Sequence, residues 1–321
     1  IGVTPDTALA KKAGLELGIK ESIVVNDRME TSVPDIYAAG DAVQVKHYVT
    51  GDDALISLAG PANKQGRIIA DNICGGDSRY LGSQGSSVIK VFDMTAATTG
   101  INETNAKKSG LEVDTVILSP MSHAGYYPGG KVMTMKVVFE KETYRLLGAQ
   151  IIGYEGVDKR IDVLATAIHA GLKATQLKDL DLAYAPPYSS AKDPVNMAGF
   201  MIDNIAKGTL KQWHLEDMDK ISKDKSVVLL DVRTVGEFNR GHMDGFRNIP
   251  VDELRERINE IEKGKPVYLI CQSGLRSYIA SRILEGNGYE TYNFSGGFRF
   301  YDAVVNDRAL IERAYACGMD Y

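Results

Sequence analysis

One cysteine, placed between an apolar run and a helix-forming stretch, constrains the C-terminal part of this chain more than any other residue. Val267-Tyr268-Leu269-Ile270 predicts a short buried strand, and the apolar spacing over Tyr278 to Leu284 predicts a helix. Cys271 therefore falls in a strand-to-helix loop, where free backbone N–H groups and the helix dipole favour an anion. Such a loop can stabilise a thiolate or a persulfide.

Two residues near this cysteine support the interpretation. Arg276 is charged at any physiological pH, and a cation beside a thiol at a helix N-terminus makes the thiol more nucleophilic. Gly274 permits a tight turn in which successive N–H groups converge on one point. The alternative is a buried, inert cysteine at a strand end, which is a common fate of a lone cysteine.

Short motifs upstream of the cysteine occur in a characteristic order. They are Leu230-Asp231-Val232-Arg233, then Glu237-Phe238, then the run from Gly241 to Pro250. In order and spacing they resemble the DVR, EF and GHI-GA-NIP signatures of the rhodanese family, whose domains carry sulfane sulfur on a loop cysteine. The resemblance extends from about His214 to the C-terminus and implies an α/β rhodanese domain.

Carried over to this sequence, the resemblance implies that Cys271 accepts the sulfur, with Gly274 and Arg276 completing the catalytic loop. The remaining loop residues, expected to contact the substrate, are Gln272, Ser273 and Leu275. The framework polar residues near the site would be Asp231, Arg233, Glu237 and His242. The short loop has the length that the family uses for sulfur, whereas phosphatase relatives use a longer one.

The composition excludes several other classes of protein. The 321 residues are enough for two or three domains, and 44% hydrophobic with 25% charged residues is a globular composition. A net charge of -5 argues against a dedicated nucleic-acid binder. No apolar run reaches the roughly 18 residues of a membrane span. The scattered Cys74, Cys271 and Cys317 form no disulfide or zinc pattern, so a reducing cytoplasm is expected.

The N-terminal segment contains a second informative motif. Ile36-Tyr37-Ala38-Ala39 predicts a short strand that ends at Gly40-Asp41. The run from Thr31 to Ala42 resembles the second FAD-contacting motif of the pyridine nucleotide-disulfide oxidoreductase family. The resemblance implies that Asp41 hydrogen-bonds the ribityl chain of the flavin, with Gly40 and Ala42 beside it. A strand-terminal turn with an aspartate cap is the alternative.

Two helices are predicted around this motif, one from Ala8 to Leu17 and one from about Pro61 to Cys74. Proline is favoured in the first turn of a helix. The family resemblance implies that the N-terminus at Pro61 faces the flavin ring. Asn63 and Arg67 on the same helix are candidate substrate contacts, or else solvent-facing residues.

Residues from about Ser86 to Ile205 predict a second unit. Its predicted strands are Val88 to Phe92, Val113 to Leu118, Val132 to Phe139 and Leu146 to Ile152. A helix is predicted between the first two strands, and two more follow the last. A four-stranded antiparallel sheet with helices on one side is an α+β pattern, and it resembles the dimerisation domain of the same flavoprotein family.

Two tyrosine-bearing loops stand out in this unit. A phenol can donate a hydrogen bond to a thiolate or polarise a disulfide. Tyr126 and Tyr184 resemble the two active-site tyrosines that coenzyme A-disulfide reductases supply from the partner subunit, and Lys192 would then contact a phosphate of coenzyme A. The alternative is an aromatic dimer interface without chemistry. Tyr127 and Tyr188 are expected to be packing residues.

Together these segments resemble the fused coenzyme A-disulfide reductase/rhodanese proteins, which are NAD(P)H-dependent persulfide or polysulfide reductases. The resemblance implies a homodimer that uses FAD and NADH or NADPH to reduce coenzyme A disulfide, coenzyme A persulfide or polysulfide. The expected domains are an FAD/NAD(P)-binding remnant (1–80), a dimerisation domain (81–206), a linker (207–213) and a rhodanese-like domain (214–321).

The chain departs from this pattern in one respect. It has no strand followed by Gly-x-Gly-x-x-Gly, and it opens on Ile1. We therefore expect the C-terminal part of a longer protein that also supplies the nucleotide loops and the flavin-side redox cysteine. Two other classes remain open: a stand-alone sulfurtransferase on a dimerising scaffold, and a non-enzymatic sulfur-relay protein.

Overall fold

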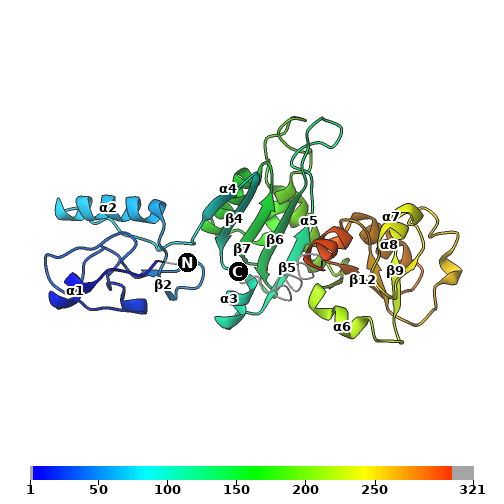
Figure 1. The fold of residues 1–321 in the computed structure, drawn as a ribbon, viewed down its shortest axis with the longest axis horizontal. Helices are drawn as coiled ribbons and strands as arrows, with labels where there is room; N and C mark the ends of the chain where they lie inside the picture. The colour runs from blue at the N-terminus through cyan, green and yellow to red at the C-terminus, as the bar shows by residue number, and fades with distance from the viewer. Residues whose placement is uncertain (1–2, 306–321) are drawn as a thin grey trace, which may run out of the picture.

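The computed structural model describes residues 3–305, which form three units in a row along the long axis of the molecule (Figure 1). Cys317 lies outside the described residues. The N-terminal unit is small and rich in turns. Its elements are α1 (Ala8–Lys12), the 3-10 helix η1 (Ile19–Glu21), β1 (Val45–Lys46), β2 (Asp53–Ala54) and α2 (Ala59–Ile73). Met29, Val43 and Val45 form its buried core, against which Ile68 and Ile69 of α2 pack.

Two predictions for this unit need correction. The first helix ends at Lys12 rather than Leu17 because Gly14 takes a φ of +76° and the Leu15 N–H bonds back to the Ala10 carbonyl, which closes the helix in a Schellman motif. The predicted strand before Gly40 is a single bridge between Tyr37 and Glu30. It pairs only with an adjacent turn of the chain, which is too short to extend a ladder.

The central unit is built on one antiparallel sheet in the order β3-β4-β7-β6-β5. Its strands are β3 (Ser87–Val91), β4 (Met94–Gly100), β5 (Val113–Leu118), β6 (Met133–Glu140) and β7 (Leu146–Gly153). The four predicted strands are present, but the sheet has a fifth, β4. The sequence did not predict β4, because this strand lacks the alternating large apolar residues that indicate a strand. Its sequence is Met94-Thr-Ala-Ala-Thr-Thr-Gly.

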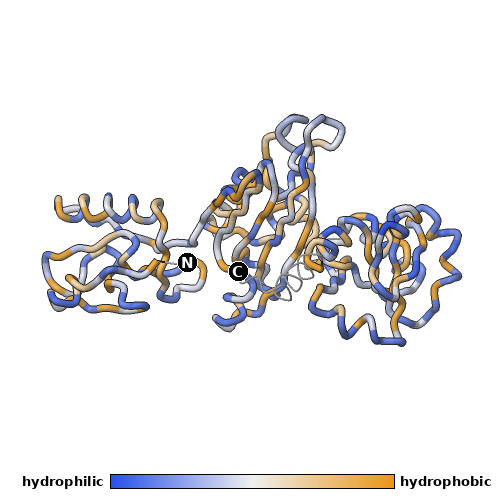
Figure 2. The backbone as a smooth tube through the Cα atoms, in the orientation of Figure 1, coloured by the Kyte–Doolittle hydropathy of each residue, from blue (hydrophilic) through white to orange (hydrophobic). Residues whose placement is uncertain are grey.

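Helices complete the α+β unit, as predicted. They are α3 (Glu103–Lys108), α4 (Val157–His169), the 3-10 helix η2 (Ala174–Asp179) and α5 (Pro194–Ala206). Helix α4 packs on β4 and β7, and α5 packs on β5. Their buried residues Leu164 and Ile202 share one core with Met135 and Val137 of β6. Two long loops project beyond this sheet and are coloured neutral to hydrophilic, whereas the strands are mostly hydrophobic (Figure 2).

The C-terminal unit is a parallel sheet in the order β10-β9-β11-β12-β8, and it confirms the predicted α/β class. Its strands are β8 (Gln212–Trp213), β9 (Val228–Asp231), β10 (Arg247–Asn248), β11 (Val267–Ile270) and β12 (Thr291–Phe294). Its helices are η3 (Leu215–Asp217), α6 (Met218–Ile221), α7 (Val235–Arg240), η4 (Ile258–Glu260) and α8 (Leu275–Glu285). Strand β11 lies at the sheet centre with a hydrophobic cluster on each face, which explains its unbroken apolar sequence.

The central and C-terminal units meet along the edge strand β5. The Ile117 N–H donates to Ser295 Oγ at 3.0 Å, and Gln212 Nε2 donates to the Thr115 carbonyl at 3.2 Å. Asp114 lies 3.2 Å from His214 across the same seam. These contacts cover backbone groups that an open sheet edge would leave exposed. Within residues 3–305, no helix has the length and apolar character needed to cross a membrane.

Candidate active site

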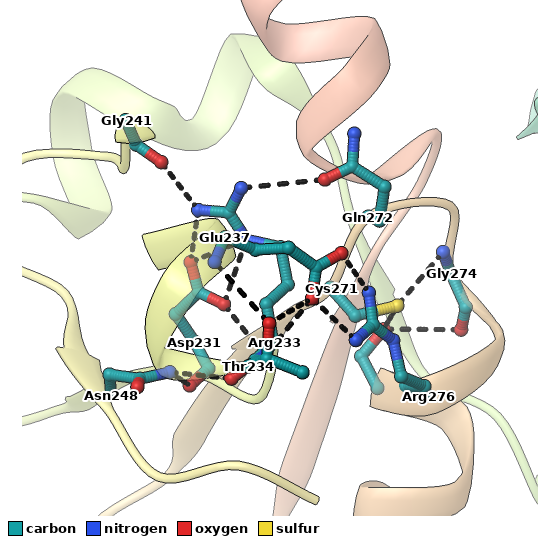
Figure 3. Close-up of polar contacts among 11 residues, drawn as sticks. Asp231, Arg233, Thr234, Glu237, Gly241, Asn248, Cys271, Gln272, Gly274 and Arg276 are labelled. Atoms are coloured by element: carbon teal, nitrogen blue, oxygen red, sulfur yellow. Dashed lines mark hydrogen bonds and ion pairs between the residues drawn. The ribbon is translucent and has the colours of Figure 1, made fainter. Parts of the chain in front are cut away.

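Cys271 lies immediately after β11, at the carboxyl end of the parallel sheet, and the loop returns directly into α8 (Figure 3). Its Sγ accepts hydrogen bonds from the Gly274 N–H at 3.1 Å and from Ser277 Oγ at 3.2 Å. Gly274 has a φ of +101°, which is why glycine is needed there to turn its N–H toward the sulfur. Of the predicted cradle of backbone amides, the Gly274 N–H bonds the sulfur, and the second donor is a side chain that the sequence interpretation did not assign.

The cysteine is closed to bulk solvent in this conformation. The residue is 1% exposed and packs in a hydrophobic cluster with Leu230 and Leu269. Burial by itself agrees with the inert-cysteine alternative. The two donors favour the other interpretation, because hydroxyl and amide groups directed at sulfur stabilise negative charge on it.

Arg276 is held by Glu237 in a two-pronged ion pair, with both N–O distances at 2.7 Å (Figure 3). Thr234 and Glu237 form the capping box of α7, which positions the carboxylate. The Arg276 bond lowers the pKa of Glu237 to about 2, and the Thr234 N–H and hydroxyl add to the effect. Glu237 was expected to be a framework residue. It binds the Arg276 guanidinium, which was expected to lie free beside the thiol.

Arg233 connects the framework residues to the loop. It pairs with buried Asp231 at 2.6 Å, donates to the Gly241 carbonyl at 2.8 Å and reaches Gln272 Oε1 at 3.4 Å. The predicted framework role of Asp231 and Arg233 agrees with these contacts. His242 lies farther out, stacked on Phe238 with ring centroids 3.9 Å apart.

The other loop residues differ in exposure. Gln272 and Ser273 are half-buried, and Leu275 is exposed. A Cβ at Gly297 would lie 2.7 Å from the Gln272 carbonyl oxygen and from Ser273, so glycine at this position allows the chain after β12 to touch the loop. The segment after β12 thus packs against Gln272 and Ser273, while Leu275 is exposed to solvent.

The two predicted tyrosines lie in the loops after β5 and before α5 and contact each other. Tyr126 Oη and Tyr184 Oη are 2.7 Å apart, although the two residues are 76% and 45% exposed. The bond to Tyr126 raises the pKa of Tyr184 above its usual value. Lys192 lies exposed on the same loop as Tyr184. Tyr188, expected to pack, is exposed as well, because its backbone rather than its ring is anchored.

The predicted flavin contacts surround the start of α2. Gly40 has a φ of +87° and donates its N–H to Gln65 of α2 at 2.8 Å. Asp41 is exposed, and its carboxylate has no partner among residues 3–305; Ala42 is half-buried. Helix α2 begins without a side-chain cap, with Pro61 in its first turn.

The candidate substrate contacts on α2 are exposed. The Asn63 amide bonds to the Ala59 carbonyl within the helix at 3.0 Å, and the exposed Arg67 lies 3.9 Å from Asp71. Neither side chain is fixed by contacts outside the helix in the described part of the chain. Both interpretations of these residues are therefore compatible with the geometry.

Each unit matches a known domain family. Residues 1–66 match the pyridine nucleotide-disulphide oxidoreductase family, residues 86–194 match its dimerisation domain, and residues 214–303 match the rhodanese-like domain. The chain therefore carries two regions that match the pyridine nucleotide-disulphide oxidoreductase family and one rhodanese-like domain. The sequence resemblances to both families are thereby confirmed.

Solved structures share both the fold and the domain combination. The reduced CoADR-RHD of Bacillus anthracis is 48% identical with a TM-score of 0.93, over 96% of this chain and 55% of that one. The NAD-dependent persulfide reductase of A. fulgidus is 42% identical with a TM-score of 0.85, over 94% of this chain and 55% of that one.

Curated relatives match about three fifths of this chain. The CoA-dependent NAD(P)H sulfur oxidoreductase of Pyrococcus furiosus is 39% identical over 60% of this chain and 44% of its own length. The coenzyme A disulfide reductase of Staphylococcus aureus is 37% identical over 62% of this chain and 45% of its own length. The chain thus spans about half the length of the relatives that it matches.

Two sets of polar residues were not singled out from the sequence. Ser277 lies at the start of α8 on the face toward the sulfur, and its place six residues after Cys271 in a rhodanese loop could have indicated it. The buried pair of Arg160 and Asp193 lies behind the tyrosine loops of the dimerisation domain. No local pattern marks that pair, because its partners are far apart in sequence.

Proposed function

We propose that this chain is part of a flavin- and NAD(P)H-dependent enzyme that reduces coenzyme A disulfide, coenzyme A persulfide or polysulfide, with sulfane sulfur handled at Cys271. The observation that carries the proposal is the Cys271 sulfur with its two donors, Gly274 and Ser277, on the same chain as a hydrogen-bonded tyrosine pair. The names of the relatives support both halves of the reaction.

The sulfur step needs only the residues of the rhodanese-like loop. The Cys271 thiolate attacks the sulfane sulfur of a donor such as thiosulfate, an S–S bond forms to Cys271, and sulfite leaves with the electron pair of the broken bond. Gly274 and Ser277 direct N–H and O–H groups to the sulfur that carries the charge. Arg276, balanced by Glu237, would orient the loop and hold an anionic substrate; Gln272, Ser273 and Leu275 would line its approach.

The residues of the N-terminal unit fit a flavin. The exposed Asp41 carboxylate can accept a hydroxyl hydrogen bond, Gly40 presents no side chain there, and Ala42 and Pro61 leave the uncapped start of α2 open to an electron-rich ring. When bound, the flavin would accept a hydride from NAD(P)H and supply the two electrons that reduce the disulfide.

The coenzyme A substrate would be held from two directions. Asn63 and Arg67 on α2 and Lys192 on the loop of Tyr184 would contact its polar groups, and Tyr126 and Tyr184 would hydrogen-bond the reacting thiolate. We propose that the tyrosines act on the partner subunit of a homodimer, as a match to a dimerisation domain suggests. The domain limits given above and a cytoplasmic location remain predictions.

The test uses the full-length protein. We expect visible flavin absorption and NADH or NADPH oxidation that depends on coenzyme A persulfide or disulfide. Cys271→Ser should abolish sulfur transfer from thiosulfate to a thiol acceptor. A colourless protein that still transfers sulfur would favour the sulfurtransferase-only alternative, which the reductase names of the relatives do not favour. Equal transfer by wild type and Cys271→Ser would reject a sulfur-carrying role for that cysteine.

A further inference from the structure

A buried arginine in the dimerisation domain contacts both tyrosine loops from inside. Arg160 lies in the first turn of α4 and is 1% exposed. Its nearest charge is Asp193, which is 2% exposed and lies 3.0 Å from Arg160 Nη2 and 3.2 Å from Nε. A charge pair removed from water is costly unless its remaining donors and acceptors are also satisfied.

Arg160 Nη1 donates to the Gly156 carbonyl at 3.2 Å, and the other remaining groups lie on the two loops that carry the tyrosines. From the loop of Tyr126, the Ser122 carbonyl accepts from Arg160 Nη2 at 2.9 Å. From the loop of Tyr184, Ser189 Oγ accepts from the same nitrogen at 3.1 Å, and the Tyr188 carbonyl lies at 3.4 Å. One guanidinium nitrogen, Nη2, therefore lies within hydrogen-bond distance of oxygens from both loops.

Further bonds make the arrangement a unit. The Ser189 hydroxyl donates to Asp193 at 2.6 Å, and the Asp193 carboxylate also caps the Val195 N–H at the start of α5. The Ala124 N–H donates to the Ser189 carbonyl at 2.9 Å, which joins the two loops directly. Space for the guanidinium depends on Gly156, where a Cβ would lie 2.1 Å from Arg160 Nη1.

The tyrosines themselves have little else to hold them. Both residues are substantially exposed, and their one mutual bond joins the two loops. A contact between two exposed side chains keeps a fixed geometry only if the backbones beneath them are fixed. Two residues before Tyr126 lies Ala124, and four residues after Tyr184 lies Tyr188, so the anchored backbone is close to both rings.

We propose that Arg160, with Asp193, is the positioning residue that sets the Tyr126–Tyr184 pair for catalysis. This inference rests on the proposed reductase function and identifies the residue that positions its tyrosines. Lysine cannot replace the arginine, because its side chain ends one bond short of Nη2, the nitrogen that contacts both loops, and it has no counterpart of the Nε that bonds Asp193. The rhodanese-like loop shares none of these contacts and should be unaffected.

The first test measures hydrogen exchange in the full-length Arg160→Lys protein. Peptides covering 119–132 and 180–193 should both exchange about tenfold faster, while 133–153 in the sheet stays unchanged. Lys159→Arg, at the neighbouring position of α4, is the matched control and should exchange like wild type. Faster exchange in one loop only, or in neither, would contradict the proposal that Arg160 holds both loops. This result does not depend on any reductase activity.

The second test is a double-mutant cycle on reductase turnover. Arg160→Lys should lower turnover about tenfold with thiosulfate sulfur transfer intact, because a misplaced catalytic group costs rate. In a Tyr184→Phe background the same change should cost less than about twofold, since its route to the reaction is already lost. A full tenfold loss in that background would show that Arg160 acts independently of the tyrosine pair and would reject the proposal.

The two tests distinguish a failure of the proposed function from a failure of the inference about Arg160. If wild type oxidises no NAD(P)H with coenzyme A disulfide, coenzyme A persulfide or polysulfide, the proposed function fails, while the exchange test still decides whether Arg160 holds both loops. If wild type is active and Arg160→Lys is equally active, only the inference about Arg160 fails. Should Arg160→Lys not fold, Ser189→Ala removes one bridging hydroxyl and should give the same two changes at smaller size.

Discussion

At the scale of single residues, the environment of Cys271 depends on groups of different kinds. One donor is a backbone N–H that only a left-handed glycine can aim, and the other is the Ser277 hydroxyl. The flexible arginine that the sequence places beside the thiol is instead bound to Glu237. The sulfur therefore depends more on local hydrogen bonds than on a free cation.

Ser277→Ala tests that dependence. Losing a hydrogen bond to a charged sulfur should slow thiosulfate-dependent sulfur transfer about tenfold, from about 1.4 kcal/mol of lost stabilisation. Ser281→Ala is the control, because Ser281 is a buried serine of α8 that bonds the Tyr278 carbonyl rather than the sulfur. Equal rates for wild type and Ser277→Ala, measured as sulfite release, would contradict this role of the hydroxyl.

The Glu237–Arg276 pair makes a pH-dependent contribution to stability. The folded pKa of Glu237 is about 2, below the ordinary value of 4.5. A lowered carboxylate pKa stabilises the fold above the unfolded value, and that stabilisation is lost as pH falls from about 4.5 toward 2. Glu237→Gln should therefore destabilise the protein by about 1 kcal/mol at pH 7 and by much less near pH 2.

Urea unfolding at several pH values measures this difference. Glu260→Gln is the matched control, since Glu260 also bonds an arginine, Arg257, but is half exposed. Its effect should stay below about 0.5 kcal/mol. A Glu237→Gln penalty that did not shrink as the pH fell below 4.5 would show that the ion pair is not its source.

At the scale of elements, α4 begins after Gly156 and ends before Gly171, and both glycines have left-handed φ values of +69° and +70°. They differ in what surrounds them. A side chain at Gly171 would meet nothing within 4 Å, whereas one at Gly156 would clash with the guanidinium of Arg160. The same left-handed backbone conformation thus occurs once beside the Arg160 guanidinium, at Gly156, and once away from it, at Gly171.

This pair allows a matched experiment. Gly171→Ala should cost about 1 kcal/mol in the free energy of unfolding, from the left-handed conformation alone. Gly156→Ala should cost at least about 2 kcal/mol more, because a buried ion pair must move. Urea unfolding of both variants measures the difference. Equal losses in the free energy of unfolding would mean that Arg160 moves aside without destabilising the protein.

The elements also show how propensity and packing divide the fold. Strands β5, β6 and β7 are rich in large apolar residues, and their predicted ranges lie close to the observed limits. Strand β4 has small and hydroxyl side chains, and it is a strand because β3 and β7 bond it on both sides.

At the scale of the whole molecule, the tyrosine pair and Cys271 belong to different units, so the two activities should be separable. Tyr184→Phe removes a hydroxyl and should lower reductase turnover of the full-length dimer by up to about 100-fold, within the range of acid–base catalysis. Sulfur transfer at Cys271 should remain at the wild-type rate. Tyr188→Phe is the control, as an exposed tyrosine of the same loop. A parallel fall in both activities would mean that the sites are coupled.

The sequence by itself determined the features that repeat over short distances. Strand β11, the turn at Gly274 and the start of α8 follow from a few adjacent residues, and so did the two tyrosine loops and both family resemblances. Periodicity and turn chemistry are local, so they can be read before the chain is folded.

Only the tertiary structure decided which distant groups share a site. The pairing of Arg276 with Glu237, the direction of the Ser277 hydroxyl and the contact of Arg160 with Ser122 and Ser189 join segments that nothing in the local sequence connects. Buried charges must find partners wherever packing brings them, and that requirement acts on three-dimensional distance rather than on sequence separation.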